Sequence, residues 1–422
     1  MRLPRCAAAA LAVLVAVLGV GAGAGAGTGL AQPSVPPPPV TTPDTDDCPY
    51  RTAPPPPVDT SEAPLPGEPT PAPLPLPEEP VGGEEMGECG VVLPPGADLL
   101  PVGITATSWV IADLDTGAVL AAKDPHARHR PASTMKLLTA LVAGTLLPPD
   151  RVVVGTQSDA DQEGSSVGMG AGGRYTVTDL FAGLLMVSGN DAAHALAVAL
   201  GGVPETLATM NARAAALGAL DTRAASVSGL DAAGMSTSAY DLALIFREVL
   251  DQQGFAELLR TRTYQFPGSG TRPSYLIGND NRLLLGYPGF LGGKTGFTDD
   301  ARHTYVGAAE RGGQRLVTVL LRAEQQPVRT SDQAAALLDY GFALPSNRPV
   351  GRLVEEAPET TTPPPPSSTT SALPPPVTAP GPAASAPPPV RDTGDAATLG
   401  WLLAGAGVVA VLVAVVHRQR RR

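Results

Sequence analysis

Three short strings, far apart along the chain, place strong limits on how this sequence can fold. Ser133-Thr134-Met135-Lys136 puts a serine and a lysine one helical turn apart, on the same face of a helix. Ser188-Gly189-Asn190 supplies a second hydroxyl and a side-chain amide, and Lys294-Thr295-Gly296 supplies a second ammonium beside a hydroxyl. If the three strings form one site, the fold must bring a helix start, a loop and a strand edge together.

The first string suits nucleophilic chemistry that uses no histidine. A serine at a helix N-terminus lies beside free backbone N–H groups, which favour a developing negative charge. The stretch after Lys136 is mostly apolar, so we expect a buried helix in which Lys136 loses its charge readily. A second positive charge nearby also favours the neutral form of Lys136, and Lys294 is the candidate for that charge. A neutral Lys136 can then take the proton from Ser133.

The other two strings supply relay and binding groups. We expect Ser188 to pass a proton between the two amines and Asn190 to hold a substrate amide through its donor and acceptor. The glycines around Lys294 predict a strand edge that another backbone approaches closely. A peptide can add to such an edge as an extra strand, with Lys294 and Thr295 binding its terminal carboxylate. Each string alone is common, but the three in this order are a specific signal.

The same strings resemble those of the low-molecular-weight penicillin-binding proteins, the serine D-alanyl-D-alanine carboxypeptidases, of the actinobacterial type with a C-terminal membrane anchor. The likeness runs from about residue 106 to about residue 342, and it includes the segment 131–136, Gly189 and Ser228-Gly229-Leu230-Asp231. It implies an α+β fold of the β-lactamase/transpeptidase-like type, an antiparallel sheet flanked by helices, here with disordered Pro-rich flanks.

The resemblance also implies a role for each site residue. Ser133 would be the acylated nucleophile, Lys136 the base and Ser188 a member of the second motif. The backbone N–H groups of Ser133 and Phe297 would form an oxyanion hole. The substrate-binding residues that the family implies are Asn190, Lys294, Thr295, Gly296, Phe297 and Arg329. No cofactor is implied.

The implied activity removes the terminal D-alanine from peptidoglycan stem pentapeptides through an acyl-serine intermediate, which limits cross-linking of the cell wall. The partners would be a stem peptide ending in D-Ala-D-Ala and, as covalent inhibitors, β-lactam antibiotics. Two alternatives stay open: a class A-like β-lactamase, which needs a carboxylate such as Glu205 to activate water, and a non-catalytic wall-binding module. Transpeptidation uses the same acyl-enzyme and stays open as well.

Composition divides the chain into a folding core and its flanks. Of 422 residues, 47 are proline and 47 are glycine, many of them outside the middle, so we predict one D,D-peptidase catalytic domain at 99–346. We expect a Pro-rich extracytoplasmic segment at 32–98 and a Pro/Ser/Thr-rich linker at 347–395 to stay extended. The net charge of −11 argues against nucleic acid as a partner.

Both ends carry membrane-targeting patterns. Basic residues before an apolar run predict a signal peptide at 1–31. An uncharged apolar segment predicts a transmembrane helix at 399–416, and the arginines after it predict a basic cytoplasmic tail at 417–422. We therefore expect a single-pass protein of the cell membrane, with the lipid bilayer as a partner and the catalytic domain outside. Cys48 and Cys89 are then a candidate disulfide, with two free thiols as the alternative.

The middle of the chain predicts strands at both ends and helices between them. Strands are expected at 108–115, 118–122, 289–298, 303–309 and 314–323. Helices are expected from residue 133 and at 176–187, 192–200, 205–217, 238–250 and 331–340. This order predicts a sheet assembled from the two ends of the domain. None of the histidines shows metal-ligand spacing, and we expect His126 and His129 at the surface.

Overall fold

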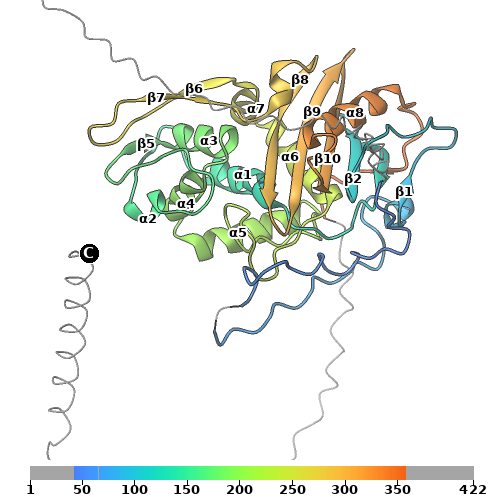
Figure 1. Ribbon diagram of the computed structural model, residues 1–422, viewed down its shortest axis with the longest axis horizontal. Coiled ribbons are helices and arrows are strands. Elements are labelled where there is room, and N and C mark those ends of the chain that lie inside the picture. The colour runs from blue at the N-terminus through green and yellow to red at the C-terminus, as the bar shows by residue number, and fades with distance from the viewer. Residues whose placement is uncertain (1–41, 65, 358–422) are drawn as a thin grey trace, which may run out of the picture. The chain divides into compact units, whose positions relative to one another are not determined.

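The computed structural model describes residues 42–64 and 66–357 (Figure 1). The predicted signal peptide, transmembrane helix and cytoplasmic tail lie outside the described residues, as does the predicted linker from residue 358 onward. Within the described ranges, no helix has both the length and the apolar character needed to cross a bilayer.

One antiparallel sheet forms the centre of the domain (Figure 1). Its strands follow the order β1-β3-β2-β10-β9-β8, and β11 also pairs with β3. Their bounds are β1 (Val91–Val92), β2 (Ser108–Asp113), β3 (Ala118–Lys123), β8 (Phe290–Thr298), β9 (Arg302–Arg311), β10 (Gln314–Ala323) and β11 (Gly351–Arg352). Strand β2 lies against β10, with Trp109 opposite Leu320. The prediction of one sheet assembled from both ends of the domain is confirmed.

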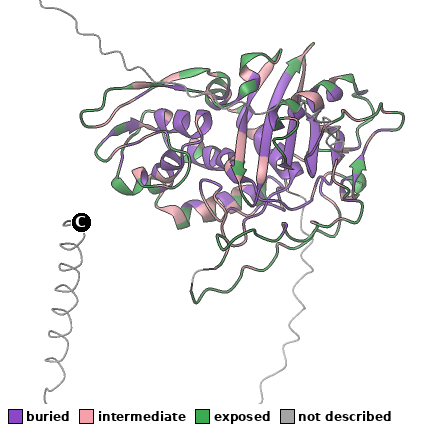
Figure 2. Cartoon of the chain, viewed as in Figure 1, coloured by how far each residue is buried: buried purple, intermediate pink, exposed green. Residues whose placement is uncertain are grey.

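Helices cover both faces of this sheet because its central strands are apolar on both sides. Trp109 and Ile111 of β2 pack in one cluster, together with residues of α8, while their neighbours Val110 and Ala112 pack in the other. The helices are α1 (Lys136–Leu146), α2 (Gln157–Ala160), α3 (Val177–Met186), α4 (Asn190–Ala199), α5 (Val203–Ala216), α6 (Ala239–Asp251), α7 (Gln253–Arg260) and α8 (Thr330–Ala343). Figure 2 shows the buried residues concentrated in the sheet and in the helices beside it.

Short elements with weak patterns escaped prediction. They include the antiparallel pairs of β4 (Val152–Val154) with β5 (Arg174–Thr176) and of β6 (Thr263–Phe266) with β7 (Tyr275–Gly278), the helix α2, the strands β1 and β11, and the 3₁₀ helices η1 (Glu84–Gly87), η2 (Ala132–Met135) and η3 (Arg282–Leu285). The longer helix α7 was not predicted either. Two- to four-residue elements carry too few side chains to display a period, so contacts elsewhere in the chain determine them.

The folded part of the chain extends beyond the predicted bounds of 99–346. Strand β1 and strand β11 both pair with β3, and Val350 and Leu353 are buried. Parts of the segment before residue 99, drawn in blue in Figure 1, contact the domain, so the expectation that this segment stays extended does not hold for those parts of 42–64 and 66–98. Arginine side chains of the domain bind its backbone carbonyls, among them Arg128 on Leu74 and Arg130 on Pro55.

A disulfide joins Cys48 and Cys89, whose Cα atoms are 5.2 Å apart. It closes residues 48–89 into what we call the disulfide loop. Proline has no backbone N–H, so a proline-rich loop has fewer backbone donors than carbonyl acceptors, and donors from elsewhere are needed. The domain supplies them as arginines, and this is why a proline-rich composition did not reveal the packing.

Candidate active site

The serine and lysine of the first string meet at the start of a buried helix. Ser133 lies in η2 and is partly exposed, while Lys136 opens α1 and is fully buried. The Nζ atom of Lys136 lies 2.8 Å from Oγ of Ser133 and 2.6 Å from the carbonyl oxygen of Ser228. The 3₁₀ turn therefore achieves what the spacing predicted, a nucleophile in direct hydrogen-bond contact with an amine.

The surroundings of Lys136 favour its neutral form. Burial lowers the pKa of Lys136 well below its usual value, and the charge of Lys294 lowers it further, while Asp280 and Asp191 act in the opposite direction. Burial also lowers the pKa of Lys294, against the charge of Asp280. Two buried amines that disfavour each other's charge allow one of them, Lys136, to serve as a base near neutral pH.

The backbone at the first two motifs is held in a left-handed conformation that side chains rarely adopt. Ala132, just before the nucleophile, has φ of 48°, and Ser188 has φ of 62°. Each such residue costs about 1–3 kcal/mol and persists only when its surroundings enforce it. Gly229 is part of that enforcement, because a Cβ there would lie 1.8 Å from the carbonyl oxygen of Ala132. The strained backbone therefore lies at the residues that position the side chains of Ser133 and Ser188.

The third string lies on β8, the strand at one end of the sheet (Figure 1). Gly296 packs against the nucleophile, because a Cβ on it would stand 2.9 Å from the backbone nitrogen of Ser133. Lys294 is fully buried, and its Nζ donates to the carbonyl oxygen of Thr295 at 2.8 Å. The Thr295 hydroxyl donates to Asp280 at 3.1 Å. An edge strand beside a serine is a suitable place for an added peptide strand.

The second string offers polar groups that have no partner within the protein. Among the described residues, the buried hydroxyl of Ser188 and the buried Oδ1 of Asn190 make no hydrogen bond. The Nδ2 group of Asn190 donates to the carbonyl of Glu163. The predicted relay contact between Ser188 and the lysines is therefore not formed here, and both unpaired groups are available to a ligand.

A cavity of about 390 Å³ lies over these motifs. Its wall consists of Ser133, Ser165, Ser188, Asp280, Arg282, Thr295, Gly296, Phe297, His303, Thr304, Tyr305, Gln325, Thr330 and Ser331. Most of the predicted site residues line it or, like Lys136, lie directly behind its wall. Phe297, predicted to offer its backbone N–H, has an exposed ring whose centroid lies 4.5 Å from that of His303.

Arg329 is the predicted residue that the structure does not bring into the cavity. It is exposed at the N-cap of α8 and does not line the wall, although the next residue, Thr330, does. Arg282 lines the cavity instead. The sequence offered no way to choose between these arginines, because η3, which carries Arg282, is too short to be predicted.

Two further residues of the site were missed for a different reason. Ser228 acts through its backbone carbonyl, which accepts from Lys136, and no side-chain pattern reports on that. Asp280 precedes β8 by several residues, and its carboxylate accepts a hydrogen bond from Thr295 of that strand. The string Ser228-Gly229-Leu230-Asp231 was visible as a landmark of the family, but no role followed from it.

The expectation that His126 and His129 lie at the surface is wrong. His126 is partly buried, with Nδ1 2.7 Å from Asp221. His129 is buried, its ring nitrogens have no hydrogen-bond partner among the described residues, and burial lowers its pKa to about 3. Both rings lie in the segment that leads to Ser133, where the disulfide loop covers them; Tyr50 of that loop packs edge-on against His129.

Comparison with known proteins gives one consistent result. The family described as D-alanyl-D-alanine carboxypeptidase (Peptidase_S11) matches residues 97–325. The D-alanyl-D-alanine carboxypeptidase DacB2 of Mycobacterium tuberculosis is 46% identical over 267 residues, which cover 62% of this chain and 90% of DacB2. DacF of Bacillus subtilis is 31% identical over 253 residues, 58% of this chain and 64% of DacF.

Solved structures agree. A crystal structure of a D-alanyl-D-alanine carboxypeptidase from Mycobacterium tuberculosis superimposes with a TM-score of 0.60 at 45% identity, covering 62% of this chain and all of that one. The Streptomyces K15 DD-transpeptidase superimposes with a TM-score of 0.56 at 29% identity, covering 58% of this chain and all of that one. The predicted penicillin-binding-protein type of α+β fold is confirmed.

Proposed function

The chain belongs to the D-alanyl-D-alanine carboxypeptidase family, and on that premise we propose which of its residues carry out the reaction. It is a serine-type hydrolase of peptidoglycan metabolism that acts on peptides ending in D-Ala-D-Ala. The observation that carries the assignment of residues is the 2.8 Å contact between Ser133 Oγ and the buried Nζ of Lys136, at the wall of the cavity beside β8.

The reaction begins when the peptide lies along the free edge of β8. Lys136 takes the proton from Ser133, and Oγ attacks the carbonyl carbon of the penultimate D-alanine. The backbone N–H groups of Ser133 and Phe297 stabilise the oxyanion. When the C–N bond breaks, the proton passes to the leaving amine by way of Lys136 or the unpaired Ser188 hydroxyl, and terminal D-alanine departs. Water then hydrolyses the acyl-serine ester and restores the enzyme.

A single incubation tests the activity. The purified protein is mixed with a peptide ending in D-Ala-D-Ala, with and without glycine as an amine acceptor, and the products are identified by mass. We expect free D-alanine and a peptide shorter by one residue. A product that carries glycine would mean transpeptidation by the same acyl-enzyme. If the peptide stays intact, the proposal fails.

The β-lactamase alternative lacks a suitably placed carboxylate. Among the described residues, Asp280 is the one carboxylate that lines the cavity, and it already accepts a hydrogen bond from Thr295. Glu205, the candidate that the sequence offered, is exposed in the first turn of α5 and does not line the cavity. We therefore propose that β-lactams acylate the protein and that the resulting ester hydrolyses slowly.

We expect amidation of the substrate's terminal carboxylate to weaken its binding about tenfold or more. Lys294 and Thr295 would bind that carboxylate, and a hydrogen bond to a charged group contributes about 1.5–3 kcal/mol. The KM values of matched free-acid and amide peptides give the answer. Arg282→Gln and Arg329→Gln then identify the assisting arginine, because the variant that loses it should show a smaller difference in KM between acid and amide. Equal KM values for the two peptides in the unmodified protein would refute the anchor.

We expect Asp280→Asn to move the pH profile of β-lactam acylation toward lower pH. Acylation rises with pH as Lys136 loses its proton. The charge of Asp280 raises the pKa of Lys136, against burial and Lys294, so removing it allows deprotonation at lower pH. The acylation rate constant, followed across the acid and neutral range, shows the shift. Asp299→Asn, which removes an exposed carboxylate outside the cavity, is the matched control, and an unmoved acid limb in Asp280→Asn would contradict the electrostatic account.

We also propose that the chain is a single-pass membrane protein with its catalytic domain outside the cell. The support is sequence alone: the apolar run 399–416, the arginines after it and the apolar run near the N-terminus. Truncation after Asp392 should release soluble, active protein, because every residue of the proposed site lies far upstream. Fractionation of cells that express both forms tests this. Full-length protein that washes off membranes at alkaline pH would contradict the anchor.

A further inference from the structure

We propose that the disulfide loop, residues 48–89, is a working part of the active site and that Glu62 within it is a positioning residue for Ser133, acting through Arg130. The loop would hold both the segment that carries the nucleophile and the end of β8 in the geometry that acylation needs. It lies outside the family match, which begins at residue 97. The inference rests on the proposed role of Ser133 as nucleophile.

The first contact fixes the segment before Ser133. Arg130 has a side chain only 2% exposed, and its guanidinium forms a two-pronged ion pair with Glu62, whose side chain is 14% exposed. It also donates to the carbonyl of Pro55 at 2.6 Å. The next residue, Pro131, accepts a hydrogen bond from Thr304 of β9 at 2.8 Å. The approach to Ser133 is therefore held between the disulfide loop on one side and the sheet on the other.

The second contact fixes the end of β8. Asp300, just beyond that strand, accepts hydrogen bonds from the backbone N–H of Val58 and, at 3.3 Å, from the hydroxyl of Ser61. Phe297, whose N–H belongs to the proposed oxyanion hole, lies three residues earlier on the same strand. The loop thus contacts both of the segments that supply donors to the oxyanion, the one before Ser133 and the one after Phe297.

The charges at this junction explain why Glu62 matters for position. Carboxylate oxygens of Glu62, Asp231 and Asp300 lie within 4.8 Å of one another, with Arg130 beside them. Asp231 belongs to the segment whose Ser228 carbonyl holds Lys136. If Glu62 loses its charge, Arg130 is drawn toward the other two carboxylates, and the backbone three residues before Ser133 moves with it.

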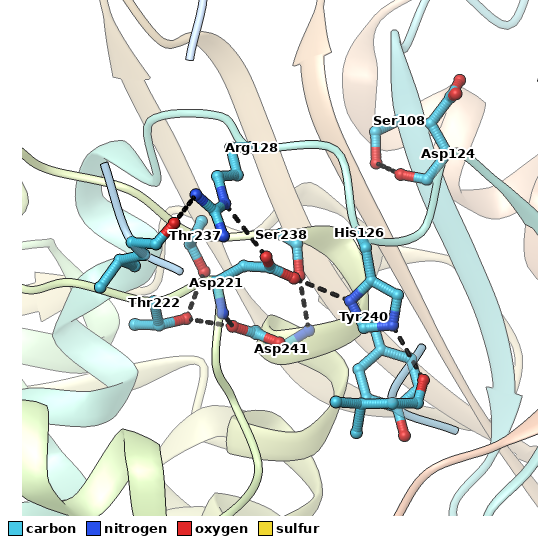
Figure 3. A network of polar contacts seen from close by, with 12 residues as sticks. Ser108, Asp124, His126, Arg128, Asp221, Thr222, Thr237, Ser238, Tyr240 and Asp241 are labelled. Atoms are coloured by element: carbon cyan, nitrogen blue, oxygen red, sulfur yellow. Dashed lines mark hydrogen bonds and ion pairs between the residues drawn. The ribbon is translucent and has the colours of Figure 1, made fainter. Parts of the chain in front are cut away.

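A second group of contacts anchors the remainder of the loop. Figure 3 shows Arg128 and His126 directed at Asp221. Nε of Arg128 lies 3.2 Å and Nδ1 of His126 lies 2.7 Å from the carboxylate oxygens of Asp221. Arg128 also donates to three carbonyls of the loop, and the other ring nitrogen of His126 lies 2.9 Å from the carbonyl of Val81. Both neighbours of the His126 ring are hydrogen-bond acceptors, and this arrangement favours a ring that is protonated on both nitrogens. The charge and hydrogen bond of Asp221 raise the pKa of His126, against burial.

All of these loop residues lie between Cys48 and Cys89, so the disulfide controls them together. The two cysteines are 41 residues apart in sequence, and linking them keeps the loop close to its binding groups. Dithiothreitol reduces the bond by thiol–disulfide exchange: its two thiols become a cyclic disulfide, and Cys48 and Cys89 become thiols. Reduction should therefore loosen the loop and lower the rate of acylation.

Point variants test the role of Glu62. We expect Glu62→Gln to lower the rate constant of acylation by a fluorescent penicillin about tenfold, since small displacements at a reacting centre are costly, with the dissociation constant of the non-covalent complex unchanged. The conservative variant Glu62→Asp, which keeps the charge, should recover most of the rate. The matched control is Glu68→Gln, an exposed carboxylate of the same loop that contacts no donor in the described part of the chain. Thermal unfolding of each variant shows whether a slower reaction comes from a misplaced Ser133 in a folded protein or from unfolding.

Redox treatment tests the loop as a unit. Dithiothreitol should lower the acylation rate of the unmodified protein reversibly and should leave a Cys48→Ser/Cys89→Ser variant, already slow, unchanged. If Glu62→Gln and Glu68→Gln acylate at the same rate as the unmodified protein, the loop is a passive cover and the inference is overturned. If the unmodified protein itself takes no label at Ser133, the proposed function has failed instead, so the two failures are distinguishable.

Discussion

Replacing Ser133 by alanine is expected to abolish both the release of D-alanine and covalent labelling by penicillin. The Oγ atom that would form the ester is the atom that the substitution removes, and the oxyanion donors and the lysine cannot replace it. Loss of a serine nucleophile costs on the order of 10⁴-fold or more in rate. Because Ser133 is partly exposed at the cavity wall, the free energy of unfolding should change by no more than about 1 kcal/mol.

The measurement combines product analysis with labelled penicillin on gels. Ser158→Ala, an exposed serine on α2 outside the cavity, controls for the loss of a hydroxyl and should behave like the unmodified protein. An adduct of undiminished yield on Ser133→Ala would show that another group is acylated.

Lys136→Arg should fold and yet lose acylation by on the order of 10³-fold, as expected when a general base is removed. Guanidinium keeps its proton at every relevant pH, so it cannot accept one from Ser133. The amine beside Ser133 is, by contrast, held toward neutrality by burial and by Lys294. Acylation rates under single-turnover conditions provide the test, and circular dichroism reports on the fold.

Two further variants make the result interpretable. Lys136→Met has nearly the same shape without a charge, so it separates loss of the base from the cost of burying a guanidinium. Lys123→Arg replaces a second buried lysine, one that binds the carbonyl of Pro43 rather than the serine, and should retain activity. Acylation of Lys136→Arg within tenfold of the unmodified protein would rule out the base role.

The central strands and the motif positions followed from local patterns in the sequence. The strand–turn–strand pattern beginning at Ser108 predicted β2 and β3, and the run through Lys294 predicted β8, because side chains in these strands repeat at a strand period or are apolar throughout. The spacing of Ser133 and Lys136 predicted their contact directly, since residues three apart in a helix share a face. Such features depend only on neighbours in sequence.

The disulfide loop could not be predicted in the same way. Its proline-rich composition is typical of segments that bury little. What folds it here is a set of donors far along the chain, such as Arg130 and Arg223, which satisfy carbonyls that prolines leave unpaired. A pairing between a loop and distant arginines leaves no period and no motif in either segment.

The arginine proposed to assist substrate binding posed a related problem. A resemblance transfers the position of Arg329 but not its side-chain direction, and the cavity is lined by Arg282 instead. Likewise, Asp280 affects both lysines through space, from a segment with no recognisable pattern. Electrostatic partners of this kind can be identified only from the three-dimensional arrangement of the strands and helices.

The proposed role of Ser133 depends most directly on the identity of the acylated atom. The protein is incubated with penicillin, digested with a protease, and the mass of each peptide is compared with that of an untreated sample. We predict that one peptide, the one containing Ser133, gains the mass of the antibiotic, and that fragmentation places the adduct on Ser133. An adduct on any other residue, or none at all on folded protein, would contradict the account.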